Sequence, residues 1–425
     1  MSIIPTDRSR IECWEKCNRK RYWQYEYLGK GITKADSLKL DARIGTGVHN
    51  GIERGLLCVA HLLSEPPTIE NLKQIALDAG AEFLTDCMKV IDWSQGTEQL
   101  KHDVVEGMHI VVASTYAWLR VKAPRLIADG EVLALEKELT VDFPVGADDV
   151  RLMARPDIVW RRKADGTIFI RNLKTVRKAD DRWREKWALD MQTLSEPLAV
   201  DKWLSEPDDE TQHDVCGGVI IDGLVTGEVL FDKYKQLYYH NNPLVYCWEG
   251  GDIGVVDNRV VDNPVFYPRY EWSCTEPHKF ANGRKCPGGK SHKLSGVRKV
   301  SVAERFPGGI LAWVDYLIDI DLALVEEMLI ELPPIMRSEY QIERWKRQAL
   351  PREVKIHNAA EMFTDGYYTS PDERLDLHFP MHTAEGNCLY PGKCQCYDLC
   401  HGTAAADPLN SGYVVRIPNH PEGEK

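Results

Sequence analysis

The densest cluster of potential metal ligands in the 425-residue chain is a run of four cysteines near its C-terminal end. Cys388, Cys394, Cys396 and Cys400 fall within 13 residues, with the spacing C-x5-C-x-C-x3-C. Short loops between thiolates close at little entropic cost, so the run can converge on one soft metal centre. Reduced cysteines without a ligand are the alternative. Zinc and iron–sulfur clusters both accept four thiolates, and the spacing alone does not distinguish them.

Composition indicates where such a chain works. It has 12 cysteines, and 53 Lys and Arg against 65 Asp and Glu give a net charge of −12. The first residues contain no apolar signal-peptide core, so we expect a cytoplasmic protein whose cysteines serve metal or redox chemistry. No membrane contact is expected, because the most apolar stretch, 313–330, contains five acidic residues. The negative charge excludes a globally basic nucleic-acid coat but permits a local basic groove.

Apolar periodicity predicts an α/β core in the first half of the chain. Val48, Ile52 and Leu56 lie four residues apart, which is typical of one helix face. Asp165-Gly166 is a turn signal between two apolar runs and predicts a hairpin. The expected elements are a helix over 44–57, strands over 131–143, 151–161 and 167–175, a helix over 180–194 that Pro197 interrupts before it resumes to 204, and a strand over 217–224.

Composition divides the rest of the chain. Cys274, His278, Cys286 and His292 have the order of a small zinc site, with free residues as the alternative. Beyond this segment, helices are expected over 313–332 and 335–348, separated by Pro333-Pro334. The predicted organisation is a core at 1–235, a loop-rich insertion at 236–310, a helical segment at 311–385, a cysteine-rich segment at 386–402 and a polar tail at 403–425.

The predicted hairpin brings Pro156-Asp157 beside Asn172-Leu173-Lys174. Phosphodiester hydrolysis needs hard divalent cations held by carboxylates, together with a base or a positioned water. A lysine beside such a cation can orient the water and offset the charge that builds on phosphorus. Single Asp and Lys residues are common on strands, so this motif is weak when taken alone.

Further elements accompany this motif in the chain. They are the segment Cys17-Asn18-Arg19-Lys20-Arg21-Tyr22-Trp23, the segment Gly45-Thr46-Gly47-Val48-His49, Gln192 after the strands with Asp157 and Asn172-Leu173-Lys174, and the C-terminal cysteines. In this order they resemble RecB-like nucleases of the PD-(D/E)xK superfamily, in the branch that includes AddB and the CRISPR-adaptation nucleases. The resemblance covers roughly residues 8–230 and 385–402.

The resemblance implies a restriction-endonuclease-like core, with a mixed sheet flanked by helices, and an iron–sulfur staple at the C-terminal end. The implied cofactor is a 4Fe-4S cluster that joins the two ends of the chain. Its expected ligands are Cys17, Cys388, Cys394 and Cys400, with Cys13 and Cys396 as competitors.

The resemblance also assigns a catalytic site for Mg²⁺ or Mn²⁺. His49, Asp157 and the residue at position 172 would hold the cation, and Lys174 would lie beside the attacking water. Gln192 would contact DNA, although Glu196 stands four residues later where the family has Tyr. Glu136 and Glu138 precede Asp157 in a region where the family often has glutamates; a solvated strand face is the alternative for them.

Asn172 departs from the family, which has Asp or Glu there. Asn keeps the shape and one carbonyl oxygen but loses the charge, which weakens the grip on a divalent cation. The site is either naturally weakened or deliberately inactivated, and on this view Asn172→Asp should raise cleavage.

The resemblance and the departure at Asn172 together leave two functions. The first is a single-stranded DNA exonuclease in recombination or repair, for example that of a phage, which works with a helicase or recombination protein. The second is an inactive DNA-binding scaffold with the same fold. A zinc-stapled interaction module is a third interpretation.

Two basic segments are candidates for DNA contact. The first interleaves Arg and Lys with aromatic residues over 8–27, and the second carries Lys174 and five further cations up to Lys186. The alternative is that the aromatic side chains face the core and the charges are solvated.

Overall fold

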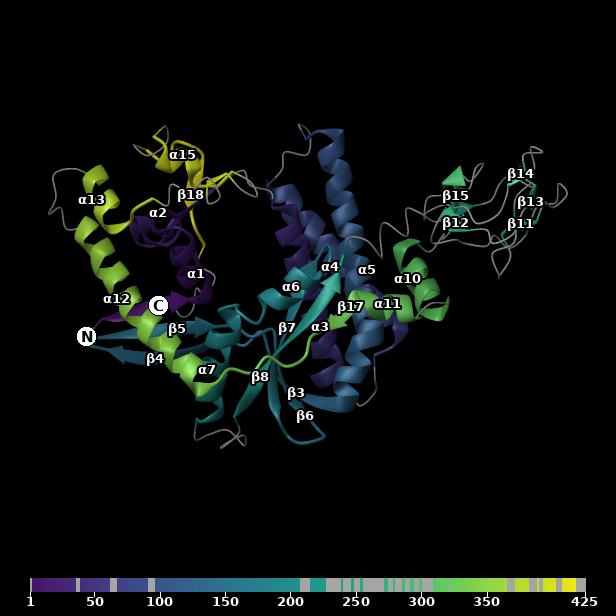
Figure 1. The fold of residues 1–425 in the computed structure, drawn as a ribbon, viewed down its shortest axis with the longest axis horizontal. Helices are drawn as coiled ribbons and strands as arrows, with labels where there is room; N and C mark the ends of the chain where they lie inside the picture. Colours follow the sequence, from purple (N-terminus) through teal and green to yellow (C-terminus); the bar gives the residue numbers. More distant parts are fainter. Residues whose placement is uncertain are drawn as a thin grey trace.

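The computed structural model describes residues 2–35, 39–61, 67–90, 96–206, 215–226, 309–320, 322–364, 371–381, 388–389, 393–402 and 407–417, together with short strands between 238 and 299. A five-stranded mixed sheet lies at the centre with helices on both faces, so the predicted α/β class is confirmed (Figure 1). Within the described ranges, no helix combines the length and the apolarity that crossing a bilayer requires.

The central sheet joins an antiparallel meander to a parallel strand. β3, β6 and β7 pair antiparallel, and β7 pairs parallel with β8. A parallel step needs a crossover, which α6 (Asp181–Lys186) and α7 (Gln192–Leu204) supply. The strand order is β17 (Leu329–Glu331), β8 (Cys216–Val225), β7 (Ile168–Val176), β6 (Ile158–Arg162) and β3 (Gly130–Leu135).

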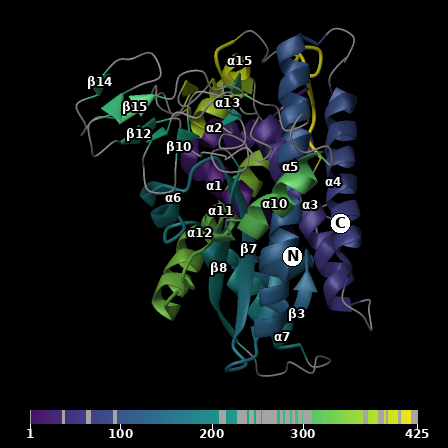
Figure 2. The same ribbon diagram turned by 90° about the vertical axis from the view of Figure 1, so that its right-hand side faces the viewer.

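Long helices cover one face of this sheet (Figure 2). Their apolar side chains pack on Phe169 and Leu173 of β7. A Cβ at Gly51 would lie 2.8 Å from the Thr115 hydroxyl oxygen, so glycine allows α3 to approach α5 closely. The helices are α3 (Leu40–His61), α4 (Ile69–Val90), α5 (Glu98–Asp129), α10 (Gly309–Ile320) and α11 (Leu322–Met328).

A second apolar core lies on the opposite face. Ile168 and Ile170 point into it, as expected from the alternation of side chains along β7. It is closed by α6, α7 and a three-stranded sheet of order β1-β5-β4. The added elements are β1 (Ile3–Asp7), α1 (Arg8–Lys16), β4 (Leu139–Val145), β5 (Asp148–Ala154) and α12 (Glu339–Thr364).

The N-terminal and C-terminal segments meet at one end of the molecule (Figure 1). Trp23, Phe379 and Tyr413 belong to one buried apolar cluster there, and β2 pairs antiparallel with β18. Arg21 and Glu353 form a buried ion pair at 2.8 Å. The elements at this end are α2 (Asn18–Arg21), a π-helix (Tyr22–Glu26), a 3-10 turn (Tyr27–Gly29), β2 (Ile32–Lys34), α13 (Pro371–His378), α15 (Tyr397–Cys400) and β18 (Tyr413–Val415).

Short antiparallel pairs are the described part of the insertion. His278 lies opposite Cys286 in the β13–β14 pair. Cys274 lies outside the described residues, so the zinc site stays a prediction. The strands are β9 (Tyr238–Tyr239), β10 (Tyr246–Cys247), β11 (Ile253–Gly254), β12 (Glu271–Ser273), β13 (His278–Lys279), β14 (Lys285–Cys286), β15 (Ser291–Lys293) and β16 (Arg298–Lys299).

Two of the strand predictions were wrong. The run 131–143 is two strands, β3 and β4, because Glu136 adopts a left-handed backbone with φ 44° that ends the first. The run 151–161 is likewise split between β5 and β6, which belong to different sheets. The apolar alternation continues through both breaks and therefore conceals them.

Three of the helix boundaries were also wrong. The break after α6 falls at 187–191, and Pro197 lies inside α7, only five residues after its start. The helix expected over 313–332 stops at Met328, after which 329–331 form β17 against β8. The helix expected over 335–348 is α12, which begins at Glu339 and continues to Thr364.

Candidate active site

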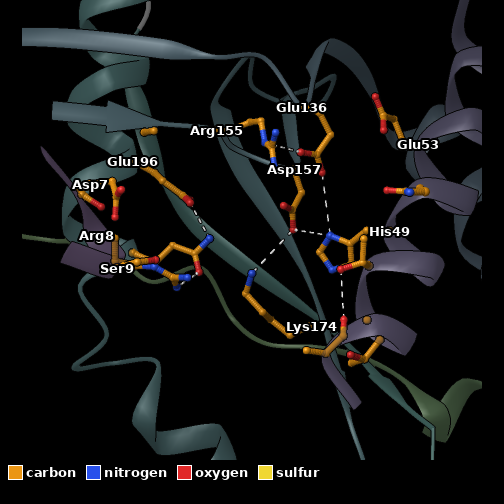
Figure 3. Close-up of a pocket in the computed structure, with 18 of the residues that line it drawn as sticks. Asp7, Arg8, Ser9, His49, Glu53, Glu136, Arg155, Asp157, Lys174 and Glu196 are labelled. Carbon is orange, nitrogen blue, oxygen red and sulfur yellow. Dashed lines mark hydrogen bonds and ion pairs between the residues drawn. The ribbon is translucent and has the colours of Figure 1, made fainter. Parts of the chain in front are cut away.

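A cavity of about 930 Å³ opens where β3 ends and β6 begins, between the first half of α3 and the start of α7 (Figure 3). Its wall is predominantly polar and charged. Residues from six separate segments of the chain meet there, including Arg8, His49, Glu136, Asp157, Lys174, Gln192 and Glu196.

Three potential cation ligands converge in this cavity. His49 Nδ1 lies 3.7 Å from Asp157 Oδ2 and 3.9 Å from Glu136 Oε1. One ligand atom of each residue falls within 4.8 Å of the others. An imidazole nitrogen with two carboxylates is a donor set that suits Mn²⁺ and, through its oxygens, Mg²⁺. The expected neighbourhood of His49 and Asp157 is therefore present, and Glu136 joins it.

Asp157 is fixed by the hairpin that the sequence predicts. It lies immediately before β6 and is 9% exposed. Its Oδ2 accepts a hydrogen bond of 2.6 Å from the backbone N–H of Leu173, and Lys174 Nζ lies 3.8 Å from the same oxygen. The strand β7 thus positions both the carboxylate and the lysine.

The backbone turn at Glu136 directs this residue into the same cavity. Its backbone N–H donates to the Asp157 carbonyl at 3.1 Å, and its carboxylate forms an ion pair with Arg155, whose Nε lies 3.1 Å away. Of the two glutamates singled out in the sequence, Glu136 lines the cavity, whereas Glu138 is not among the described residues that line it. Glu53, one helical turn after His49, also lines it; burial, followed by the charge of Glu136, raises the pKa of Glu53.

Asn172 and Gln192 meet at Glu196. Asn172 Nδ2 donates to Glu196 Oε2 at 2.6 Å, and Gln192 Nε2 donates to Glu196 Oε1 at 2.5 Å. Arg8 Nη1 in turn donates to Gln192 Oε1 at 2.6 Å. Burial raises the pKa of the Glu196 carboxyl to about 7, against the opposing effects of Lys174 and Asn172. Asn172 is fully buried and is not among the described residues that line the cavity, whereas Glu196 lines it.

Sequence reasoning found Glu196 only as a departure from the family pattern. Its contact with Asn172 joins a helix to a strand 24 residues away. The helical and strand periodicities of a sequence describe single elements and do not reveal such a contact. The available signal was the spacing of Gln192 and Glu196, because residues four apart share a helix face.

The two basic segments have different environments. Arg19 and Arg21 are buried: Arg19 Nε donates to the Phe379 carbonyl at 2.7 Å, and Arg21 pairs with Glu353. Tyr22, Trp23 and Tyr25 are buried as well, so in this first segment the aromatic rings serve the core. In the second segment, exposed cations lie on α6 and in the connection before it: Arg177, Lys178, Arg182, Arg184 and Lys186.

The cysteines expected to bind the cluster lie at the joined chain ends. The backbone N–H of Cys394 donates to the Cys388 carbonyl at 2.8 Å, and Cys394 and Cys400 pack against the apolar cluster that contains Trp23. Burial, followed by the charge of Cys17, raises the pKa of the Cys400 thiol. All four are partly exposed. Cysteine thiolates with half-buried surroundings fit an iron–sulfur cluster.

The two competing cysteines have different surroundings. Cys13 and Cys396 are buried. The Cys13 thiol donates to Gln24 Oε1 at 3.2 Å. Cys396 hydrogen bonds to Cys394 and, as the largest effect, lowers the pKa of that thiol to about 6. Both competitors therefore have protein partners of their own.

No protein-family model matches the chain, and the search of curated proteins found no match. The motifs and the geometry of the two sites therefore carry the functional argument.

Proposed function

We propose that the protein is a Mg²⁺- or Mn²⁺-dependent DNA nuclease with a PD-(D/E)xK-like core of the RecB-like, iron–sulfur branch. The observation that carries the proposal is the convergence of His49, Glu136, Asp157 and Lys174 on one cavity from separate segments of the chain. The antiparallel meander followed by a crossover to a parallel strand supports the same core.

Each residue then has a defined task. His49, Glu136 and Asp157 would hold the cation, which when bound supplies Lewis acidity and lowers the pKa of a bound water. The Leu173 N–H holds the Asp157 carboxylate in place. Lys174 orients the attacking water and offsets negative charge on phosphorus. Gln192, held by Arg8, faces the cavity from α7, where a DNA backbone would pass.

The proposed substrate is single-stranded DNA at an end, in recombination or repair, with a helicase or recombination protein as partner in the cytoplasm. The exposed cations of α6, which follow Lys174 along the chain, would bind phosphates despite the net charge of −12. The 4Fe-4S cluster, held by Cys17, Cys388, Cys394 and Cys400, would have a structural role at the joined chain ends.

End-labelled single-stranded DNA tests the proposal. We expect wild-type protein to release short products only with Mg²⁺ or Mn²⁺, and Asp157→Asn to release none. Asp103→Asn is the matched control, because Asp103 belongs to a partly exposed group with His102 and Glu106 that is not among the residues lining the cavity. Equal cleavage by wild type and Asp157→Asn would reveal a contaminating nuclease and contradict the proposal.

A second function rests on Asn172. If the amide at this position has disabled the cation site, the protein binds DNA without cutting it and acts as a scaffold. Salt-dependent binding with no cleavage by the wild type would favour this function.

A further inference from the structure

The environment of Asn172 and Glu196 bears on whether the site is disabled. Asn172 has no exposed surface and is not among the described residues that line the cavity, whereas Glu196 does line it and is 6% exposed. Because a carboxylate only accepts hydrogen bonds, the Asn172 amide nitrogen must face Glu196, and its oxygen faces the Asp157 backbone N–H at 3.5 Å. Asn172 therefore bridges the Asp157 segment and Glu196 from behind the cavity wall.

The cost of burial makes Glu196 unusual. Burying a carboxylate costs several kcal/mol unless hydrogen bonds and opposite charges compensate for it. Here two amide groups donate to it, from Asn172 and Gln192, and no ion pair is formed by Glu196 within the described residues. A neutral Gln could fill the same volume without the charge, so packing alone does not account for an acidic residue at the cavity wall.

An acid at either position would put the charge in nearly the same place. The two side chains touch at 2.6 Å, so an acid at 172 with an amide at 196 is the mirror image of the present pair. Acids at both positions would put two carboxylates in contact, which is unfavourable without a cation between them.

We propose that Glu196 is a cation-binding carboxylate of this site and carries the negative charge that Asn172 lacks, so that the two positions are an exchanged acid–amide pair. This inference rests on the proposed function. It makes the wild-type chain a competent nuclease rather than a disabled one. The rival account gives Glu196 only a structural role as acceptor for two amides.

Manganese binding, measured from the electron paramagnetic resonance signal of free Mn²⁺, tests the inference without an activity assay. We expect Glu196→Gln to weaken binding by about tenfold or more, because the charge of the ligands sets the affinity. The exchange variant Asn172→Asp/Glu196→Gln should restore binding to within about threefold of wild type, since it returns one carboxylate to the contact. Asp157→Asn should also lose binding, and Asp103→Asn should not.

The variants separate the failure of the inference from that of the function. Wild-type affinity in Glu196→Gln, with binding lost in Asp157→Asn, overturns the role of Glu196 and leaves the proposed function standing. Affinity that Asp157→Asn does not change, or no binding by the wild type, overturns both. If Glu196→Gln fails to fold by circular dichroism, the exchange variant decides: restored binding supports the inference, and absent binding overturns it.

Discussion

The cavity and the cysteine-bearing end of the molecule both gather residues from distant parts of the chain, but different forces hold them. At the cavity, polar groups are held by one another: Asp157 by a backbone N–H, Glu196 by two amides, Gln192 by Arg8. At the other end, an apolar cluster, a strand pair and a buried ion pair join the chain termini beside the cysteines.

The difference indicates how far each region depends on its proposed metal group, the divalent cation in the cavity and the iron–sulfur cluster at the cysteine end. The partly exposed Lys174 can be changed without altering the apolar cores, so its substitution should separate activity from folding. The cysteine end has its own packing, so a cluster there adds to an interface that already exists.

The largest expected effect belongs to the cavity. Lys174→Ala should lower the rate of cleavage by about 100- to 1000-fold, the usual cost of losing one group that stabilises charge in a transition state. The melting temperature should change little, because Lys174 is partly exposed and its ion pair with Asp157 is 3.8 Å long. Single-turnover kinetics and thermal melts check this. A large drop in melting temperature alongside the loss of cleavage would mean that the two regions do not differ as described.

The second effect belongs to the cysteine end. Glu353→Ala should lower the free energy of unfolding by about 3 kcal/mol, the lower end of the cost of breaking a buried ion pair, because buried Arg21 keeps only Glu26 as an acidic partner. Glu343→Ala in the same helix is the control, since Glu343 is exposed and its pair with Lys346 should contribute little to stability. Denaturant unfolding measures both. Similar losses for the two variants would show that the buried pair does not hold the ends together.

A smaller effect is expected for the cluster itself. Cys17→Ser should remove iron and the brown absorbance, and should lower the melting temperature by less than Glu353→Ala does, because the apolar cluster remains. Cys13→Ser should keep its iron, since that thiol is engaged with Gln24. The iron and sulfide content of each variant after anaerobic purification measures whether the cluster is present. Stoichiometric zinc without iron, or loss of iron in Cys13→Ser, would contradict the assignment of ligands.

The smallest effect concerns the DNA surface. Arg182→Ala/Arg184→Ala should weaken single-stranded DNA binding and reduce the salt slope by about 0.7 for each phosphate that the variant no longer neutralises. Lys89→Ala on α4 is an exposed control, with its charge already paired to Asp86. Fluorescence anisotropy at several salt concentrations measures the slopes. An unchanged salt slope in the double variant would show that DNA does not contact Arg182 and Arg184 of α6.

The sequence predicted the hairpin at the centre of the fold and a helix that carries His49, from a turn signal and local periodicity. The choice of His49 as a ligand came from the resemblance to RecB-like nucleases, and the hairpin places Asp157 beside Lys174. Glu136 was visible as a candidate, but the backbone turn that aims it at His49 was not, because alternation continues through it.

Tertiary contacts account for what was missed. The burial of Arg19 and Arg21 depends on Phe379 and Glu353, more than three hundred residues away. The pairing of β17 with β8 likewise crosses the whole insertion. The contact of Asn172 with Glu196 also changes an expectation: Asn172→Asp alone would put two carboxylates together, so it should lower the melting temperature of the metal-free protein rather than simply restore activity.

Anomalous diffraction from crystals soaked in Mn²⁺ tests the central claim most directly, because it locates the cation instead of inferring it from activity. The account predicts a manganese peak in the cavity, in contact with His49 and Asp157, that disappears in Asp157→Asn. A cavity without manganese, with the ion bound instead at the partly exposed group of His102, Asp103 and Glu106, would contradict it.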